Sequence, residues 1–190
     1  MANERVGFAV TGSFCTLDKA MTQLEALARL GYDLTPIMSQ TVYDTDTRFG
    51  RAEDFRRRMA DLCGRPVWHT VAQVEPIGPK NLLDLLVVAP CTGNSLAKLA
   101  SGIADTAVTM AVKAHLRNRG PVLLGVSTND ALGGAAKNIG ALLNARQIYF
   151  IPMGQDAPDK KPASVVAHFD LLPDAVQAAL GGVQLQPVLC

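Results

Sequence analysis

One segment constrains the fold of this chain more than any other, the run APCTGNSLAKLASGIAD at residues 89–105. The apolar residues 82–88 come directly before it and have the composition of a buried strand. The run begins with small polar residues around a proline and continues as an amphipathic helix. A strand that passes through a polar turn into a helix is typical of open α/β sheets, which bind ligands where their strands end. Thr92, Asn94 and Ser95 supply hydrogen-bonding groups there, and the free N–H groups of a helix N-terminus favour an anion.

The rest of the chain alternates short apolar runs with helical patterns. The apolar runs predict strands at residues 6–11, 34–38, 82–89, 121–127 and 148–151. Apolar residues at helical spacing predict helices at residues 14–28, 52–63, 94–118, 131–145 and 163–180, with breaks at Gly102 and Pro173. Polar residues 40–50 are expected to form a loop. This alternation predicts an α/β fold, a three-layer, Rossmann-like, doubly wound parallel sheet.

The length of the chain, 190 residues, suits one domain with a sizeable core. Because no repeat or linker divides the sequence, we expect a single domain over residues 1–190. Within that domain, the segment GQDAPDKKPAS at residues 154–164 is predicted to be a loop. Residues 165–190 are predicted to form a C-terminal helical tail.

Composition excludes several classes of protein. Hydrophobic residues make up 48% of the chain and charged residues 18%, which indicates a globular protein. A net charge of +1 gives no reason to expect nucleic acid or an anionic membrane as a partner. The sequence has no apolar run long enough for a membrane span and no signal-peptide pattern at its start. Its four cysteines show no C-x-x-C pairing, so we expect free thiols in a reducing cytoplasm and no metal site.

The first predicted strand meets the first predicted helix at the turn Thr11-Gly12-Ser13. Gly12 permits close approach of the backbone, and the Ser13 hydroxyl suits a phosphate at the helix N-terminus. A role for Ser13 as a helix N-cap alone explains the residue equally well. The turn lacks the G-x-G-x-x-G pattern, so a mononucleotide such as FMN fits it better than a dinucleotide.

Three further polar residues fall at the predicted ligand edge or beside it. Ser39 ends the second strand. Asn129 follows the fourth strand and suits a substrate carbonyl or carboxylate, although capping of the next helix is an equal alternative. Arg48 lies on the loop 40–50, and its guanidinium fork suits a carboxylate. A surface ion pair with Asp44 or Asp46 is the simpler explanation of Arg48 when it is taken alone.

The run at residues 89–105 resembles the flavin signature P-A-T-A-N-x-x-A-K-x-A-x-G-I-A-D of the homo-oligomeric flavin-containing cysteine decarboxylase superfamily. The matching residues are Pro90, Thr92, Asn94, Ala97, Lys98, Ala100, Gly102, Ile103, Ala104 and Asp105. The resemblance implies a flavoprotein-type fold and FMN held by residues of the strand ends, with hydroxyls near Ser39 at the flavin phosphate. The residues expected to hold the cofactor are Gly12, Ser13, Ser39, Thr92, Asn94 and Ser95.

The chain departs from this superfamily at its catalytic histidine. That residue lies fourteen positions before the proline of the flavin signature, and the chain has Pro76 there. His69 is seven residues further back and is a poor substitute. The superfamily's substrate motif P-x-M-N-x-x-M is reduced to Asn129, since Val126 and Thr128 replace its proline and first methionine.

Several blocks show a closer resemblance to one branch, the B subunits of bacterial dipicolinate synthases. The blocks are GFAVTGSFCT, TDTRFG, EPIGPK, GVSTNDALG and FIPMGQDAPDKKPASVVAHFDLLP. This resemblance implies oxidation of a dihydrodipicolinate-type compound to pyridine-2,6-dicarboxylate in the mother-cell cytoplasm during sporulation. It also implies a trimer-based homo-oligomer, with the pocket near a subunit interface, and NADP on a partner A subunit.

The resemblance therefore implies an FMN-dependent oxidoreductase subunit, in which we expect Asn129 and Arg48, together with Lys161, to face a dicarboxylate substrate. Aromatising a dihydropyridine is a two-electron transfer that a flavin can accept. Two alternatives stay open. One is an FMN-dependent decarboxylase, against which Pro76 argues, and the other is a non-catalytic scaffold or substrate-binding subunit for the A subunit.

Overall fold

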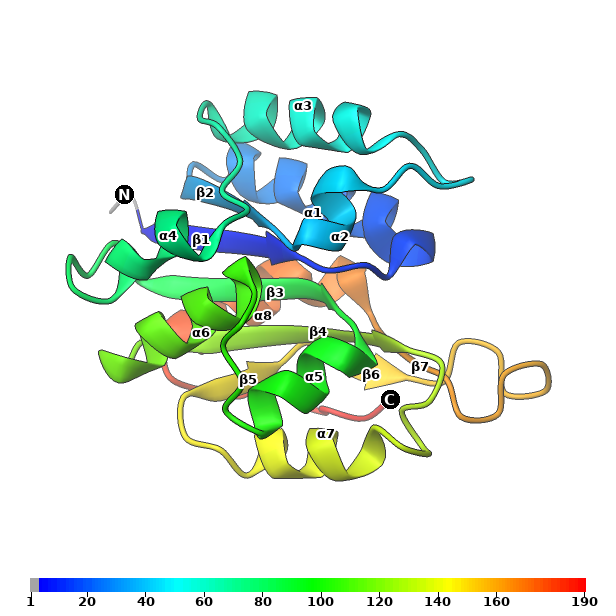
Figure 1. Ribbon diagram of the computed structural model, residues 1–190. Helices are drawn as coiled ribbons and strands as arrows, with labels where there is room; N and C mark the ends of the chain where they lie inside the picture. The colour runs from blue at the N-terminus through cyan, green and yellow to red at the C-terminus, as the bar shows by residue number, and fades with distance from the viewer. Residues whose placement is uncertain (1–3) are drawn as a thin grey trace.

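Strand β3 (Leu85–Cys91) lies inside the sheet, and all seven of its residues are buried. The computed structural model describes residues 4–190, and within them the strands form a seven-stranded sheet in the order β2-β1-β3-β4-β7-β6, with β5 also paired to β4. The remaining strands are β1 (Arg5–Val10), β2 (Asp33–Met38), β4 (Val122–Thr128), β5 (Ile148–Phe150), β6 (Met153–Gly154) and β7 (Val165–Ala167). Strands β1 to β5 pair in parallel, as predicted (Figure 1).

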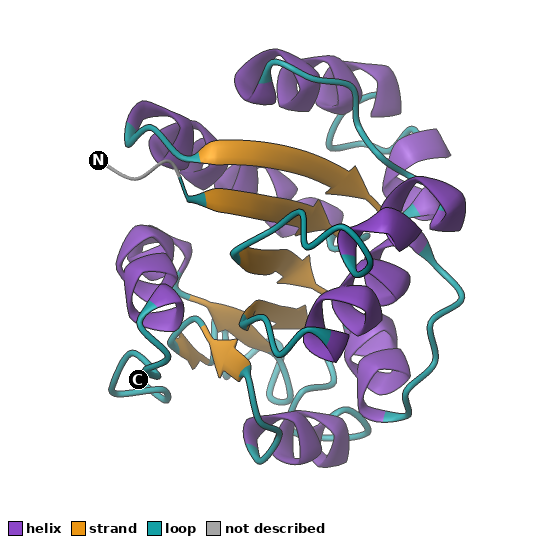
Figure 2. Ribbon diagram, turned by 90° about the vertical axis from the view of Figure 1, so that its left-hand side faces the viewer, coloured by secondary structure: helices purple, strands orange, loops and turns teal. Residues whose placement is uncertain are grey.

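Helices cover both faces of the sheet, which confirms the predicted three-layer arrangement (Figure 2). One face carries α1 (Phe14–Arg29), α3 (Ala52–Cys63) and α8 (Leu172–Leu180). The other carries α4 (Val71–Val74), α5 (Gly93–Ala100), α6 (Ala107–Arg117) and α7 (Ala136–Leu143). The short helix α2 (Gln40–Asp44) follows β2, and 3-10 turns occupy Glu75–Ile77 and Phe169–Leu171.

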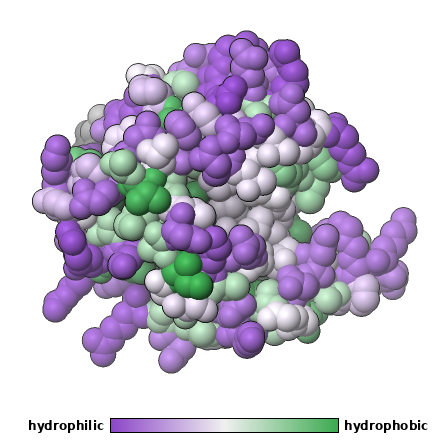
Figure 3. All heavy atoms as spheres, in the orientation of Figure 1, coloured by the Kyte–Doolittle hydropathy of each residue, from purple (hydrophilic) through white to green (hydrophobic). Residues whose placement is uncertain are grey.

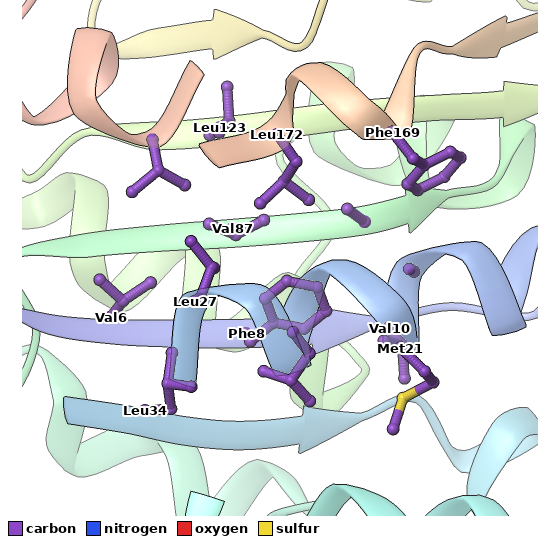
Figure 4. Close-up of a cluster of buried hydrophobic side chains, with 14 of the residues drawn as sticks. Val6, Phe8, Val10, Met21, Leu27, Leu34, Val87, Leu123, Phe169 and Leu172 are labelled. Atoms are coloured by element: carbon purple, nitrogen blue, oxygen red, sulfur yellow. The ribbon is translucent and has the colours of Figure 1, made fainter. Parts of the chain in front are cut away.

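Alternating residues of the buried strands build a separate core on each face. Val6, Phe8 and Val10 of β1 point toward α1 and α8, where they pack with Leu172 and other apolar side chains (Figure 4). Ala9, between them in sequence, belongs to the core on the opposite face. Because successive side chains of a strand point to opposite faces, a strand buried on both sides is apolar throughout. This explains the uninterrupted apolar composition of residues 85–91.

The register of the parallel strands brings their carboxyl ends to one edge. Val10, the last residue of β1, is paired with Met38, the last of β2. On the other side of β1, Ala9 is paired with Val88 of β3, and Cys91 at the end of β3 is paired with Val126 of β4. The polar segments that follow these four strands therefore lie side by side.

The C-terminal segment differs from the sequence prediction. Helical spacing predicts one helix over residues 163–180, but Val165–Ala167 form strand β7, and the helix begins only at Leu172. The pairing of β7 with Ser127 and Thr128 explains the difference, because β5 pairs with β4 only as far as Leu124 and leaves the end of β4 free. Of the tail 165–190 expected to be helical, residues 183–190 contain no helix, and Gly154 of the predicted loop belongs to β6.

The helices predicted at residues 14–28 and 52–63 have their observed ends to within one residue. Gly31 and Gly64 follow α1 and α3 with positive φ angles of 88° and 65°, and the break predicted at Gly102 separates α5 from α6. Two predictions are wrong in part, since residues 40–44 of the predicted loop are helical and the helix predicted from residue 131 starts at Ala136. Among the helices of residues 4–190, none has the length and apolar character that a membrane span requires.

Candidate cofactor and substrate site

The turn after β1 leaves the N-terminus of α1 open. Ser13 occupies the N-cap position, but within residues 4–190 its side chain makes no capping hydrogen bond. Its hydroxyl instead lies 2.7 Å from that of Ser127 at the end of β4. The alternative that Ser13 serves only as an N-cap therefore does not account for its side chain.

Thr11 joins this turn to the turn after β3. The buried Thr11 hydroxyl donates to the Pro90 carbonyl at 2.8 Å and accepts from the Thr92 backbone N–H at 3.0 Å. Thr92 in turn caps α5, accepting from the Ser95 backbone N–H at 3.3 Å. The two polar turns are thus fixed to each other by hydrogen bonds that sequence spacing does not indicate.

A cavity of about 260 Å³ lies between the segments that follow β1, β2 and β3, and we name it the α5 cavity. Its lining residues are Thr11, Gly12, Ser39, Gln40, Thr41, Thr92, Asn94, Ser95, Lys98 and Thr106. The Ser39 Oγ atom is buried and has no hydrogen-bond partner among the described residues. A buried hydroxyl without a partner costs free energy, so a ligand that bonds to Ser39 would be favoured here.

A second cavity of about 190 Å³ adjoins it, and we name it the β4 cavity. Its lining residues are Gly12, Ser13, Cys15, Thr92, Ser127, Thr128, Asn129, Asp156, Lys161 and Val166. Gly12 and Thr92 belong to both cavities. All six residues predicted to bind the cofactor therefore line one cavity or the other, and Asn129 and Lys161 line the second.

The predicted substrate residue Arg48 lies apart from both cavities. Thr47 and Gly50 exchange backbone hydrogen bonds of 3.0 and 3.1 Å, and this tight turn presents Arg48 and Phe49 to solvent. The guanidinium of Arg48 stacks over the Phe49 ring at 4.8 Å. The simpler alternative, an ion pair with Asp44 or Asp46, is not formed in the part of the chain that the structure describes.

Two projecting segments flank the edge where the strands end. Figure 1 shows the loop before α3 above this edge and the loop 155–164 below it, and Figure 3 shows a hollow of near-neutral hydropathy between them. Lys161 on the lower loop pairs with Asp156 at 3.2 Å. Hydrogen bonding by Ser164 and the charge of Lys161 hold the pKa of Asp156 below its ordinary value. The Ser164 hydroxyl also lies 3.3 Å from Oδ1 of Asn129, which places this loop beside the end of β4.

Lys98, Cys15 and Asp156 line the cavities but are not among the site residues predicted from the sequence. Lys98 of α5 pairs with Asp105 at 2.8 Å and lowers the pKa of that carboxyl. Both residues match the flavin signature, and this match is the sequence signal that could have identified the pair as part of the site. Cys15 is exposed in the first turn of α1, and no sequence pattern marks it.

The histidines and Cys91 lie outside this site. His69 stacks on Tyr43 with ring centroids 3.6 Å apart, and His115 is buried against the Pro121 carbonyl at 3.0 Å. Cys91 is fully buried, as expected of a packing residue, and burial raises its pKa to about 12. The described residues hold no cluster of His, Cys, Asp or Glu suited to a metal ion.

Comparison with known proteins defines the class. The flavoprotein family model matches residues 1–158 of the chain. The crystal structure of the FMN-dependent cysteine decarboxylase SpaF is similar in fold, with a TM-score of 0.69 and 21% identity over 94% of this chain and 96% of that one. The chain belongs to the flavoprotein family.

More similar relatives define the branch. The chain is 45% identical over 189 residues to the B subunit of dipicolinate synthase from Bacillus subtilis (strain 168), covering 100% of this chain and 94% of that protein. It is 46% identical to the B subunit of dipicolinate synthase from Bacillus halodurans C, whose crystal structure gives a TM-score of 0.91 over 100% of this chain and 97% of the other. Within the flavoprotein family, the chain falls in the branch of the dipicolinate synthase B subunits, whose designation implies a partner, the A subunit.

Proposed function

We propose that the chain binds FMN across the α5 and β4 cavities and takes part in oxidising dihydrodipicolinate to pyridine-2,6-dicarboxylate. NADP is bound by the A subunit in this proposal. The proposal rests on one observation, that Gly12 and Thr92 line both polar cavities, so the two cavities adjoin each other. The strand ends that line these cavities bear the flavin-type signature.

The size and chemistry of the cavities suit a mononucleotide. Each cavity is smaller than the roughly 300 Å³ at which small-molecule sites begin, so a ligand of FMN size would occupy both. The free N–H groups at the start of α1 and the unpartnered Ser39 hydroxyl favour an acceptor such as phosphate. Gly12, Ser13, Ser39, Thr92, Asn94 and Ser95 would hold the cofactor.

The substrate carries two carboxylates, which need cationic or amide partners. Asn129 and Lys161 line the β4 cavity, where an incoming carboxylate would exchange with Asp156 for the Lys161 ammonium. Arg48 lies apart from both cavities in the single chain, and in this proposal it meets the second carboxylate where the pocket lies near a subunit interface, since its fork bonds a carboxylate in two places. These three side chains bind and orient the substrate.

The reaction removes two electrons and two protons from dihydrodipicolinate and leaves the aromatic ring. FMN, when bound, supplies the two-electron acceptor. NADP⁺ on the A subunit is the terminal oxidant in this proposal. The chain's contribution is to hold the substrate's carboxylates at Asn129, Lys161 and Arg48, and the ring beside the turn that bears Ser13.

A second candidate is a non-catalytic, substrate-binding subunit. One observation favours it, since the charged groups that line the cavities, Lys98, Asp156 and Lys161, are all in ion pairs. Before substrate binds, none of these three groups is free to act as a general base. Decarboxylation is disfavoured because Pro76, in the 3-10 turn Glu75–Ile77, replaces the histidine that the superfamily uses.

We also propose a trimer-based homo-oligomer in the mother-cell cytoplasm during sporulation, without nucleic acid or membrane as a partner. An apolar groove on α5 and α6 supports self-association. Leu99, Val112 and Leu116 line it beside Ile103, whose side chain is 47% exposed. Apolar surface of this kind is often covered in an assembly.

Calorimetric titration of the purified chain with FMN and with FAD tests the cofactor assignment. We expect one FMN per chain and markedly weaker FAD binding, because the turn after β1 lacks a dinucleotide fingerprint. Ser39→Ala is expected to weaken FMN binding. Ser101→Ala, outside both cavities at the end of α5, serves as a control expected to bind FMN normally. Equal affinity for both flavins, or none for either, would contradict the assignment.

A further inference from the structure

Three hydroxyl groups meet beneath the turn that we assign to the cofactor. The Oγ atoms of Ser13 and Ser127 are 2.7 Å apart, and Ser127 Oγ lies 2.9 Å from Thr16 Oγ1. The third side of the triangle, from Thr16 Oγ1 to Ser13 Oγ, measures 3.1 Å. Thr16 and Ser127 are only 4% and 3% exposed, so water contributes little to their hydrogen bonding.

The number of protons in this triangle limits what Ser13 can do. Each hydroxyl has one proton, and three bonds around a closed ring would use all three. A phosphate group accepts hydrogen bonds from its surroundings, so Ser13 must direct its proton outward to bond it. The Ser13 oxygen must then be held by protons from its two buried neighbours.

We propose that Thr16 and Ser127 are positioning residues that make Ser13 a donor toward the FMN phosphate, an inference that rests on the function proposed above. Thr16 and Ser127 both donate to the Ser13 oxygen, and Ser13 donates to the phosphate. Hydrogen bonds in such a chain polarise one another, which strengthens the terminal donor. Of these three hydroxyl groups, only that of Ser13 bonds to the phosphate.

The same contact connects the cofactor turn to the substrate side of the site. Ser127 is two residues before Asn129 and pairs with Val166 of β7 in the sheet. Val166 lines the β4 cavity together with Ser13 and Asn129. Ordering of the hydroxyl chain by a bound phosphate therefore acts on the end of β4 that carries Asn129.

Binding of FMN and riboflavin to single and double variants tests this proposal. Ser127→Ala and Thr16→Val are each expected to weaken FMN binding about tenfold, the effect of one lost hydrogen bond, while riboflavin, which has no phosphate, loses little. Thr35→Val is the matched control, because Thr35 is also 4% exposed but bonds Arg65, away from the cavities. It should bind FMN normally.

The double variant separates positioning from general destabilisation. Once Ser13→Ala has removed the terminal donor, adding Ser127→Ala should not weaken FMN binding further. Independent, multiplicative losses in the double variant would overturn the inference, as would equal losses for FMN and riboflavin or normal FMN binding by Ser127→Ala. Failure of the unsubstituted protein to bind FMN would overturn the proposed function and this inference together.

Discussion

Replacing Thr11 by valine tests how the two polar turns are held together. Valine keeps the branched shape but removes the hydroxyl that donates to Pro90 at 2.8 Å and accepts from the Thr92 N–H at 3.0 Å. The Pro90 carbonyl keeps a bond of 3.1 Å from the Thr11 backbone, whereas the Thr92 N–H loses its partner. One lost bond costs about 1 kcal/mol and one orphaned N–H about 1–3 kcal/mol, so we expect the free energy of unfolding to fall by about 2–4 kcal/mol.

Urea unfolding of the chain measures this loss at unchanged m-value. Thr35→Val is again the control, because its hydroxyl accepts a 3.2 Å bond from the exposed Arg65 and should contribute less than about 1 kcal/mol. Thr11→Val should also weaken FMN binding, since Thr92 lines both cavities. A Thr11→Val protein as stable as Thr35→Val would show that the Thr92 N–H does not depend on the Thr11 hydroxyl.

Three further outcomes are expected. Arg48→Ala should lower kcat/KM for dipicolinate formation at least about tenfold when the A subunit is supplied. Arg48→Lys should recover only part of this loss, because an ammonium lacks the guanidinium fork. An unchanged kcat/KM in Arg48→Ala would show that Arg48 does not bind the substrate. Gly120→Ala should lower the free energy of unfolding by about 1–3 kcal/mol, because the new Cβ would overlap the buried His115 ring. Gly140→Ala, in open space on α7, should be neutral or stabilising by up to about 1 kcal/mol in the same urea assay. A thiol reagent should modify Cys15 and Cys190 quickly at neutral pH in the native protein, because both are exposed. Cys63 and Cys91 should react slowly, because burial raises the pKa of each thiol to about 12. Fast modification of all four cysteines would contradict the burial of Cys63 and Cys91.

The layered fold could be predicted because its signals are local. Apolar runs and helical spacing identify the parallel strands and their helices, and glycines at positions 31 and 64 mark the ends of two helices. Parallel strands bring their carboxyl ends to one edge, so the polar residues after each strand could be grouped without knowledge of the tertiary structure. This is why the six residues proposed for the cofactor line two adjoining cavities.

Non-local contacts account for what the sequence did not reveal. Strand β7 is only three residues long, and its partner in β4 lies about forty positions earlier, so helical spacing in residues 163–180 dominated the prediction. The approach of Ser127 to Ser13 spans 114 positions and has no sequence signature. Lys161 was expected to face the substrate as a cation, but its pairing with Asp156 depends on the path of the loop 155–164.

A single-turnover experiment tests whether FMN bound to this chain accepts the electrons of the substrate. The FMN-loaded chain is mixed under anaerobic conditions with chemically prepared dihydrodipicolinate, without the A subunit or NADP, and flavin absorbance and dipicolinate are both followed. If the flavin accepts the electrons of the substrate, its absorbance should bleach and one dipicolinate should form per FMN. Dipicolinate formation only in the presence of NADP together with the A subunit, while the flavin remains oxidised throughout, would contradict a redox role for this chain and support the substrate-binding alternative.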